Sequence, residues 1–347
     1  MKAAIFHGPE RMVLEDVPEP KLERDNLIAR VECCAICGSD IKIFHAGHAR
    51  IKPPQIIGHE FAATVLEAGP EVKEFRPGDR ITMATSISCM DCEWCRSGDT
   101  NLCSNLTPIS SAYPGAYAEK MAVPGKGIQG GFTFKIPDGL PNEAAALAEP
   151  LSCVLNAQVI SGVRLGHMVV VVGGGPLGCL NAEAARALGA TRVIVTQRSK
   201  PRQDLVKRLN VDAVVDASQG NVVEEVRRLT NGRMADVVMV AAPTAHAQEE
   251  ALQLARKNGV VNLFASLPKE APYLNINSRL IHYNQISLMG AAESAPKHVD
   301  WALKLLAAGR INYKAIITHR FPLSRIMDGF RVMEEKTGLK VLIEPGK

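Results

Sequence analysis

The stretch VVVVGGGPLG, residues 169–178, decides the fold of the second half of this chain. Its four valines predict a strand buried on both faces, and the glycines that follow have the spacing G-x-G-x-x-G at the start of a predicted helix. This spacing lets the backbone approach a pyrophosphate, whose charge is stabilised by the free amides of the helix N-terminus. We therefore predict a dinucleotide-binding turn, with a plain glycine-rich turn as the alternative. The residues expected to contact the dinucleotide are Gly173, Gly175, Pro176, Leu177 and Gly178.

The sequence around this turn predicts a parallel sheet. From Met168 to Gly290, apolar runs alternate with segments of helical period, which is typical of strands joined by crossover helices. The first helix is expected over residues 176–188, because proline suits the first turn of a helix and Gly189 can end it. The next strand is expected over residues 192–196.

The first part of the chain has a different residue pattern. Up to about residue 150, proline and glycine separate short β-rich runs, for example at residues 27–32, 62–67 and 80–83. This pattern predicts a β-rich domain. After residue 290 we expect one more helix, which includes residues 299–306, and short strands at residues 315–317 and 341–343.

The end of the second predicted strand bears on the choice of dinucleotide. An NAD enzyme would offer a carboxylate to the ribose hydroxyls there, but this chain has Gln197 instead. The residues that follow include three cations and a hydroxyl, which suit the 2′-phosphate of NADP: Arg198, Ser199, Lys200 and Arg202. We predict a preference for NADP. The alternative is a solvated basic loop, with Gln197 alone holding the ribose of NAD.

Four of the nine cysteines lie within residues 89–103. Cys89, Cys92, Cys95 and Cys103 have the spacing C-x2-C-x2-C-x7-C, and four thiolates so close in sequence can enclose one zinc ion. Such a closed site is structural, because no position is open to substrate. Reactive thiols or disulfides would need an oxidising setting. A zinc ribbon that reads nucleic acid is disfavoured by the acidic neighbours Asp91, Glu93 and Asp99.

The composition excludes several classes of partner. Forty Lys and Arg against 36 Asp and Glu leave a net charge of only +4, too small and dispersed for a general nucleic-acid binder. The N-terminus lacks the apolar core of a secretory signal, and no apolar run is long enough to span a membrane. With metal-type cysteine spacing, these features predict a cytoplasmic protein with neither nucleic-acid nor membrane partners.

A third set of residues is dispersed in sequence. Cys37 lies in CAICGSD, His59 and Glu60 in IIGHEF, and Glu149 in LAEP. A thiolate, an imidazole and carboxylates are the ligands that hold a catalytic zinc ion while leaving one position for water or substrate. Taken singly, each of these residues could equally be an ordinary core residue.

Together, these pieces resemble the zinc-dependent medium-chain dehydrogenase/reductase family, and within it the polyol branch of sorbitol-like and threonine-like dehydrogenases. The resemblance covers essentially the whole chain and rests on seven motifs: CGSD, GHE, PGDRI, the four cysteines, GAYAE, AEP and the glycine turn. It implies an α/β protein with two domains. The GroES-like β-rich catalytic domain would comprise residues 1–150 and 288–347, and the Rossmann domain, a doubly wound parallel sheet, residues 151–287.

The resemblance also implies roles for individual residues. Cys37 and His59 match catalytic zinc ligands, Glu149 stands where the polyol branch has a glutamate ligand, and Glu60 either binds the zinc or lies just behind it. Two zinc ions per chain are therefore expected. Asp40 matches the residue that orients the zinc histidine.

The residues of the expected proton relay match the family's pattern only in part. Ser39 matches the hydroxyl that passes the alcohol proton outward. Lys42 stands where many relatives have the histidine that ends the relay, and an ordinary lysine is a poor base at neutral pH. Lys42 would then bind the cofactor ribose, and water or His45 would take the proton.

The implied activity is hydride transfer between NAD(P) and a secondary alcohol of a polyol or sugar derivative. An amino-alcohol or simple secondary-alcohol dehydrogenase is the alternative, and a nucleotide-binding protein without activity would not need the open metal site. The basic segment 42–52 would favour phosphorylated or acidic sugars, unless it is merely a solvated loop. Phe44 and Tyr113 are proposed substrate contacts, and the family suggests a homo-oligomer, either a dimer or a tetramer.

Overall fold

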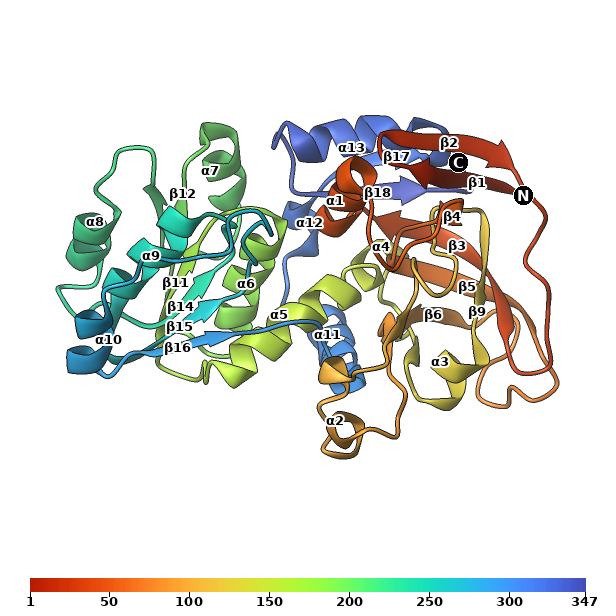
Figure 1. Ribbon diagram of the computed structural model, residues 1–347, viewed down its shortest axis with the longest axis horizontal. Helices are drawn as coiled ribbons and strands as arrows, with labels where there is room; N and C mark the ends of the chain where they lie inside the picture. The colour runs from red at the N-terminus through yellow and green to blue at the C-terminus, as the bar shows by residue number, and fades with distance from the viewer. The chain divides into compact units, whose positions relative to one another are not determined.

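The computed structural model describes residues 1–347, which form two compact units. Figure 1 follows the chain through both of them. The first unit comprises residues 1–152, 293–308 and 317–347, and the second comprises residues 153–292 and 309–316. These divisions differ from the expected ones at three places: residues 151–152 belong to the first unit, and residues 288–292 and 309–316 belong to the second.

The second unit contains a six-stranded sheet in the order β13-β12-β11-β14-β15-β16, with all neighbouring strands parallel. This is the order of a doubly wound dinucleotide-binding sheet, as the sequence predicted. Its strands are β11 (Met168–Val172), β12 (Arg192–Gln197), β13 (Ala213–Asp216), β14 (Ala235–Val240), β15 (Ala255–Leu263) and β16 (Ser287–Gly290). The helices that accompany them are α6 (Pro176–Ala187), α7 (Lys200–Val206), α8 (Val222–Leu229), α9 (Ala245–Leu254) and α10 (Ser278–Asn284).

Strand β11 lies at the centre of this sheet, and its valines are buried, as their sequence predicted. Val170 pairs with Ile194 on one side and Val238 on the other, so both edges of the strand are satisfied. Helix α6 begins at Pro176, and Gly189, just past its end, has the positive φ of 95° that a glycine adopts without strain. The predicted limits of this helix therefore hold to within one residue.

The strand expected at residues 315–317 is wrong. Residues 313–316 form a short helix, α12 (Tyr313–Ile316), and the strand β17 (Ile317–Pro322) follows it. The physical reason lies in Asn312, whose side-chain oxygen accepts a hydrogen bond from the N–H of Ala315 at 3.3 Å and so favours a helical turn. The N–H of Asn312 donates to Glu183 of α6 at 2.8 Å, which ties this segment to the second unit.

The first unit is rich in strands, with helices around them. Its largest sheet has the order β10-β6-β5-β3-β18-β17, and β9 also pairs with β3. These strands are β3 (Leu27–Ala35), β5 (Glu60–Ala68), β6 (Arg80–Met83), β9 (Lys120–Val123), β10 (Thr133–Lys135), β17 and β18 (Lys340–Glu344). Because β18 pairs with β3, the C-terminal segment completes the sheet that the N-terminal segment begins.

Smaller elements complete the first unit. A three-stranded sheet contains β1 (Lys2–Gly8), β2 (Arg11–Asp16) and β4 (Gln55–Ile56), and β7 (Ser86–Ile87) pairs with β8 (Thr107–Pro108). The helices are α1 (Gly38–Ala46), α2 (Glu93–Arg96), η1 (Thr100–Leu102), α3 (Gly125–Gln129), α4 (Asn142–Ala145), α11 (Pro296–Ala307), η2 (Leu323–Arg325) and α13 (Ile326–Glu334). Helix α5 (Ala148–Ile160) begins in this unit.

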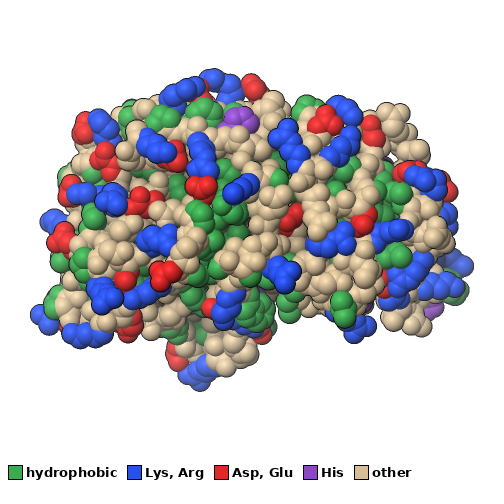
Figure 2. Space-filling view, turned by 180° about the vertical axis from the view of Figure 1, so that it is seen from behind, with side chains coloured by type: hydrophobic (Ala, Val, Ile, Leu, Met, Phe, Trp, Pro, Cys, Tyr) green, Lys and Arg blue, Asp and Glu red, His purple; other side chains and the backbone are tan.

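The surface agrees with the even charge balance of the sequence. Figure 2 shows basic and acidic side chains intermixed over the face that it presents. No helix is both long and apolar enough to cross a membrane.

The closest approach between α6 and the glycine turn yields a prediction about stability. A Cβ atom added to Gly178 would lie 1.8 Å from the carbonyl oxygen of Gly173, so neither backbone could remain in place. We expect Gly178→Ala to cost about 2 kcal/mol, typical of overpacking, and to lower the melting temperature by about 4–8 °C in differential scanning calorimetry. Gly290→Ala is the matched control, because nothing lies within 4 Å of its Cβ position. Equal melting temperatures of the two variants would contradict the prediction.

Candidate functional site

The pairing of two strands creates the first cluster of candidate ligands. In the antiparallel register of β3 and β5, Ala35 at the end of β3 lies opposite Glu60 at the start of β5. The residues just beyond these ends therefore meet, although they are far apart in sequence. The ligand atoms of Cys37, His59 and Glu60 all lie within 4.8 Å of one another.

Asp40 supports this cluster from inside the protein. It is completely buried, and its Oδ2 accepts hydrogen bonds from the Cys37 N–H at 2.9 Å and the Tyr117 hydroxyl at 2.7 Å. Its Oδ1 lies 3.5 Å from Nδ1 of His59. Burial alone would raise the pKa of Asp40, but His59 and these hydrogen bonds hold it below its ordinary value. A carboxylate that faces Nδ1 leaves Nε2 of the imidazole for a metal ion.

Glu60 is engaged from its other side by Lys340, a residue of β18. Both side chains are buried, at 0% and 1% exposure, and the Lys340 ammonium donates to both carboxylate oxygens of Glu60 and to the Ile36 carbonyl. Burial alone would lower the pKa of Lys340, yet the Glu60 charge raises it. Sequence reasoning missed Lys340, because a lysine at the start of the apolar run KVLIE reads as an exposed strand end.

Glu149 lies in the first turn of α5 and is 8% exposed. Thr85 Oγ1 donates a hydrogen bond to its Oε1 at 3.4 Å. Burial raises the pKa of Glu149 to about 7, because its charged form is poorly solvated there; the charges of Glu60 and Glu293 add to this effect, and those of His59 and Lys340 oppose it. Thiolate, imidazole and carboxylate together form a donor set that fits zinc, and the orientation of His59 by Asp40 agrees with this.

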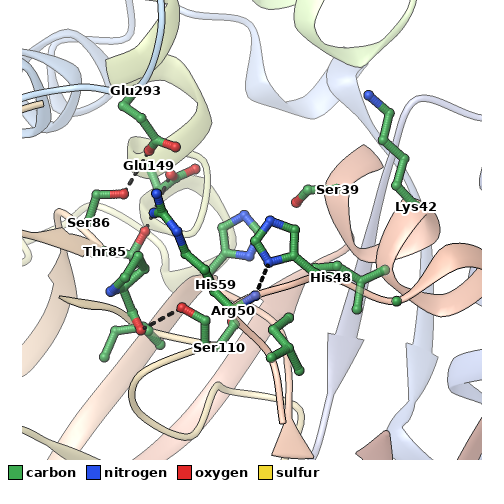
Figure 3. A pocket seen from close by; sticks show the side chains of 16 residues that line it. Ser39, Lys42, His48, Arg50, His59, Thr85, Ser86, Ser110, Glu149 and Glu293 are labelled. Atoms are coloured by element: carbon green, nitrogen blue, oxygen red, sulfur yellow. Dashed lines mark hydrogen bonds between the residues drawn. The ribbon is translucent and has the colours of Figure 1, made fainter. Parts of the chain in front are cut away.

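These residues border a cavity of about 270 Å³ in the first unit, shown in Figure 3. Ser39, Lys42, His59 and Glu149, all singled out from the sequence, line it. His48 and Arg50 also line it, and the sequence analysis pointed to them only as members of the basic segment 42–52; it did not identify the other polar lining residues, Thr85, Ser86, Ser110, Ser111 and Glu293. These come from separate loops.

Three predicted residues lie away from this lining. Phe44 is buried with its ring against Phe330, at 5.6 Å between ring centroids, so it serves the core. Tyr113 forms an isolated bridge with Ile109 and does not line the cavity. Both nitrogens of His45 are engaged, by Glu10 at 2.5 Å and Glu334 at 2.6 Å, so it is a bridge on the surface rather than a group in the cavity.

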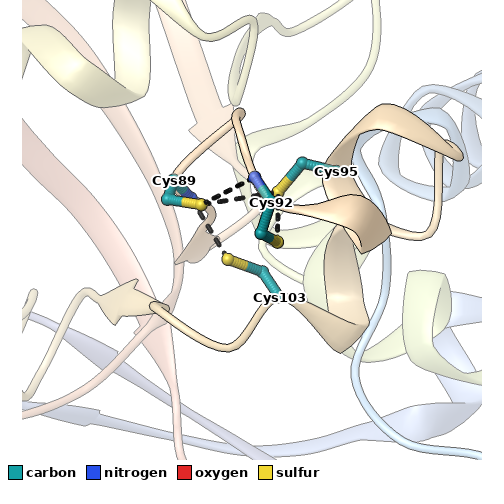
Figure 4. Close-up of side chains that lie close together, drawn as sticks. All are labelled: Cys89, Cys92, Cys95 and Cys103. Atoms are coloured by element: carbon teal, nitrogen blue, oxygen red, sulfur yellow. Dashed lines mark hydrogen bonds between the residues drawn. The ribbon is translucent and has the colours of Figure 1, made fainter.

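The four cysteines of residues 89–103 form the second cluster (Figure 4). All four sulfurs lie within 4.8 Å of one another, and none forms a disulfide. Backbone N–H groups point at these sulfurs, for example from Cys92 to Cys89 at 3.4 Å and from Asn105 to Cys103 at 3.3 Å. N–H donors from Asp91 and Cys92 lower the pKa of Cys89 to about 6. The thiolate, the form that binds zinc, is thus favoured at Cys89 and Cys92, whereas burial raises the pKa of Cys103 to about 11.

Side-chain hydrogen bonds of Gln197 hold the glycine turn of the second unit in place. Gln197, at the end of β12, accepts a hydrogen bond from the Gly174 N–H at 2.8 Å and donates one to Ser199 Oγ at 3.0 Å. Of the cations that follow, Arg198 is exposed, and Lys200 pairs with Asp204 at 3.7 Å. These bonds order the turn that leads into α6. The first backbone N–H groups of this helix belong to Leu177 and Gly178, because Pro176 has none.

Arg202 lies beside this turn, with its Nη1 3.5 Å from the Cβ position of Gly175. It makes no ion pair, its buried Nε has no hydrogen-bond partner, and burial lowers its pKa. An uncompensated, half-buried cation next to the glycine turn is costly unless an anion binds there.

Comparisons with known proteins agree with this geometry. Residues 23–138 match a family model described as an alcohol dehydrogenase GroES-like domain, and residues 176–308 match one described as a zinc-binding dehydrogenase. The chain is 31% identical to a sorbitol dehydrogenase of Halalkalibacterium halodurans, over 99% of each chain. It is 33% identical to an L-threonine 3-dehydrogenase of Pyrococcus horikoshii, over 99% of this chain and 97% of the relative. A crystal structure from Sinorhizobium meliloti 1021, described as a zinc-binding dehydrogenase bound to NADP, superimposes with a TM-score of 0.90 at 32% identity and 99% coverage of both chains.

The two clusters together give a prediction about metal content. Because each offers a zinc-type donor set, we expect two zinc ions per chain by plasma mass spectrometry of the purified protein. Cys103→Ser should reduce this to one ion and lower the melting temperature, since a structural zinc contributes to folding. Cys153→Ser, outside both clusters, should keep both ions. Two ions in Cys103→Ser, or one ion in the wild type, would contradict this assignment.

Proposed function

Because the chain belongs to the zinc-dependent medium-chain dehydrogenase/reductase family, in its polyol branch, we propose that it interconverts a secondary alcohol of a polyol or sugar derivative with its ketone. The family and the GroES-like and Rossmann folds expected from the sequence are confirmed. The observation that carries the proposal is that the ligand atoms of Cys37, His59 and Glu60 lie within 4.8 Å of one another, while His59 and Glu149 line one cavity with several hydroxyl groups.

Cys37, His59 and Glu149 are the proposed ligands of the catalytic zinc, with Glu60 behind them. The pairing of Glu60 with Lys340 supports this choice, because its charge is already compensated. The raised pKa of Glu149 supports it too, since burial destabilises the charged carboxylate and a bound metal ion would offset that cost. Zinc bound there supplies a Lewis acid that lowers the pKa of a substrate hydroxyl, and the bound dinucleotide accepts the hydride.

The protein's own groups handle the proton. When the alcohol is oxidised, a bound nicotinamide would accept the carbinol hydride, and Ser39 would pass the hydroxyl proton outward. The engagement of His45 by Glu10 and Glu334 supports water, rather than His45, as the final acceptor. The Lys42 ammonium points away from the other labelled side chains in Figure 3, which supports a contact with the cofactor ribose rather than with the substrate.

We propose that NADP is preferred over NAD. Three observations support this choice: β12 ends in Gln197 without a carboxylate, Arg202 lies uncompensated beside the glycine turn, and the Sinorhizobium relative binds NADP. Gln197 is engaged in bracing the turn through Gly174, so the cation is the group available to a 2′-phosphate. Arg198 and Ser199 lie near enough in sequence to contribute.

The cysteines and the edge of the sheet bear on the cellular location and the oligomeric state of the enzyme. We propose a cytoplasmic location, supported by nine cysteines of which none forms a disulfide. A dimer or tetramer is supported by the position of β16 at the edge of the sheet, where a second copy could pair.

An amino-alcohol dehydrogenase is the second candidate function, favoured by the similarity to the Pyrococcus enzyme. A panel of polyols, sugar acids, sugar phosphates and threonine, read by absorbance of the reduced cofactor, distinguishes the two.

Paired glutamate variants test the ligand assignment. We expect Glu149→Gln to lose the catalytic zinc, leaving one ion per chain, together with activity. Glu60→Gln should keep two ions but lose about 3–5 kcal/mol of stability, because it leaves Lys340 buried without its partner. Metal analysis and calorimetry of both variants are the measurements. The assignment is overturned if Glu60→Gln loses the ion and Glu149→Gln keeps it.

Cofactor preference is tested at Arg202. Arg202→Ala should lower kcat/KM for NADP roughly 10- to 100-fold, the value of one hydrogen bond to a charged group, with a much smaller effect for NAD. Arg208→Ala, an exposed arginine outside the turn, is the matched control and should change neither value. A wild-type enzyme that strongly prefers NAD would defeat the proposal.

A further inference from the structure

The turn after α1 directs two donors at the cavity. His48 and Arg50 both line it, and the turn is held by the buried Ile51, whose N–H donates to the His48 carbonyl at 3.0 Å. In Figure 3 the Arg50 side chain extends across the cavity toward the side of Thr85. The short loop therefore places a guanidinium group over the space where a substrate would lie.

This guanidinium has no partner within the protein. No carboxylate lies within 4.0 Å of Arg50, whereas other arginines of the first unit are paired, for example Arg24 with Glu71 at 2.8 Å and Arg320 with Glu143 at 3.0 Å. All five N–H donors of Arg50 are thus available, in the planar arrangement that matches a carboxylate.

His48 adds a second donor. Its Nδ1 accepts a hydrogen bond from the backbone N–H of Arg50 at 3.2 Å. The ring proton is then on Nε2, which can donate to a ligand. Of the two lysine and arginine side chains in the lining, Lys42 points its ammonium away in Figure 3, so Arg50 is the cation over the cavity.

We propose that the substrate is a sugar acid, whose single carboxylate is bound by Arg50 and the Nε2–H of His48. This inference rests on the proposed function and specifies which polyol derivative the site takes. Without such a group, binding a neutral polyol would remove water from the Arg50 charge with no compensation.

The remaining lining disfavours a phosphate and suits a polyhydroxy chain. Glu293 also lines the cavity, so a dianion would meet this carboxylate and only one cationic side chain directed at it. At about 270 Å³ the cavity is near the lower limit of ligand pockets, roughly 300–1,000 Å³, which suits a small sugar acid. The Glu293 carboxylate, which accepts a hydrogen bond from Ser86 Oγ at 2.7 Å, offers further acceptor capacity to substrate hydroxyls.

The test compares matched substrates and variants. Hexonates (gluconate, galactonate, gulonate and idonate), the corresponding hexitols, and sorbitol 6-phosphate are assayed with the zinc-loaded enzyme. The selectivity is the kcat/KM of the best hexonate divided by that of the best hexitol. We expect the wild type to favour the hexonate at least 10-fold, and Arg50→Gln to lower this ratio roughly 10- to 100-fold, mainly through KM, as one charge-assisted contact is lost.

Two further variants control the experiment. Arg50→Lys should recover part of the selectivity, because it keeps the charge but not the two-pronged geometry. Arg76→Gln, which removes an 85% exposed arginine of the same unit outside the cavity, should keep the wild-type ratio. Higher salt should raise KM for the hexonate more than for the hexitol.

Calorimetric titration of the hexonates into the cofactor-free holoprotein separates this inference from the proposed function. Binding that is lost in Arg50→Gln supports the anion site even if no substrate in the panel is oxidised, a result that would count against the proposed function alone. The inference is overturned if Arg50→Gln binds hexonates as the wild type does, if its hexonate and hexitol rates fall by the same factor, or if sorbitol 6-phosphate is the preferred substrate.

Discussion

The buried ion pair between Glu60 and Lys340 is the interaction on which the candidate site depends. It joins the start of β5 to the last strand of the chain, β18, beside the end of β3. Two charges in a dry interior are tolerated only when they neutralise each other, so the pair fixes these strands in a single register. That register presents Cys37 and His59 on the same edge of the sheet, and the ammonium of Lys340 is engaged by Glu60 rather than by Glu149.

A related argument applies to two cations at binding surfaces, the partly buried Arg202 and the solvent-exposed Arg50. Arg202 beside the glycine turn and Arg50 over the cavity are arginines without a carboxylate, in units where many other charges are paired. A cation held near a binding surface without compensation is stabilised when an anion arrives. The proposals of a phosphate at the dinucleotide turn and of a carboxylate on the substrate both rest on this argument.

The two candidate metal clusters differ in how close together in the chain their residues lie. The cysteine cluster closes on itself within one loop, and its sulfurs are surrounded by backbone N–H donors, so it can stabilise that loop without a hydrophobic core. The other cluster takes its residues from strand ends and a helix start that are far apart in the chain. It borders a cavity lined by hydroxyl groups, which is what a catalytic metal needs if the substrate is to reach it.

The sequence by itself determined the local structures. The valine run with its glycine turn gave β11 and α6, and the spacing of the four cysteines gave their cluster, because both depend on residues close together in the chain. The sequence motifs also pointed to Cys37, His59 and both glutamates. Only the tertiary structure decided that Glu60 is held by Lys340, that His45 is engaged on the surface, that Phe44 is a core residue, and that Arg50 extends over the cavity. These outcomes depend on strand register and loop path, which are set by packing between distant segments rather than by local periodicity.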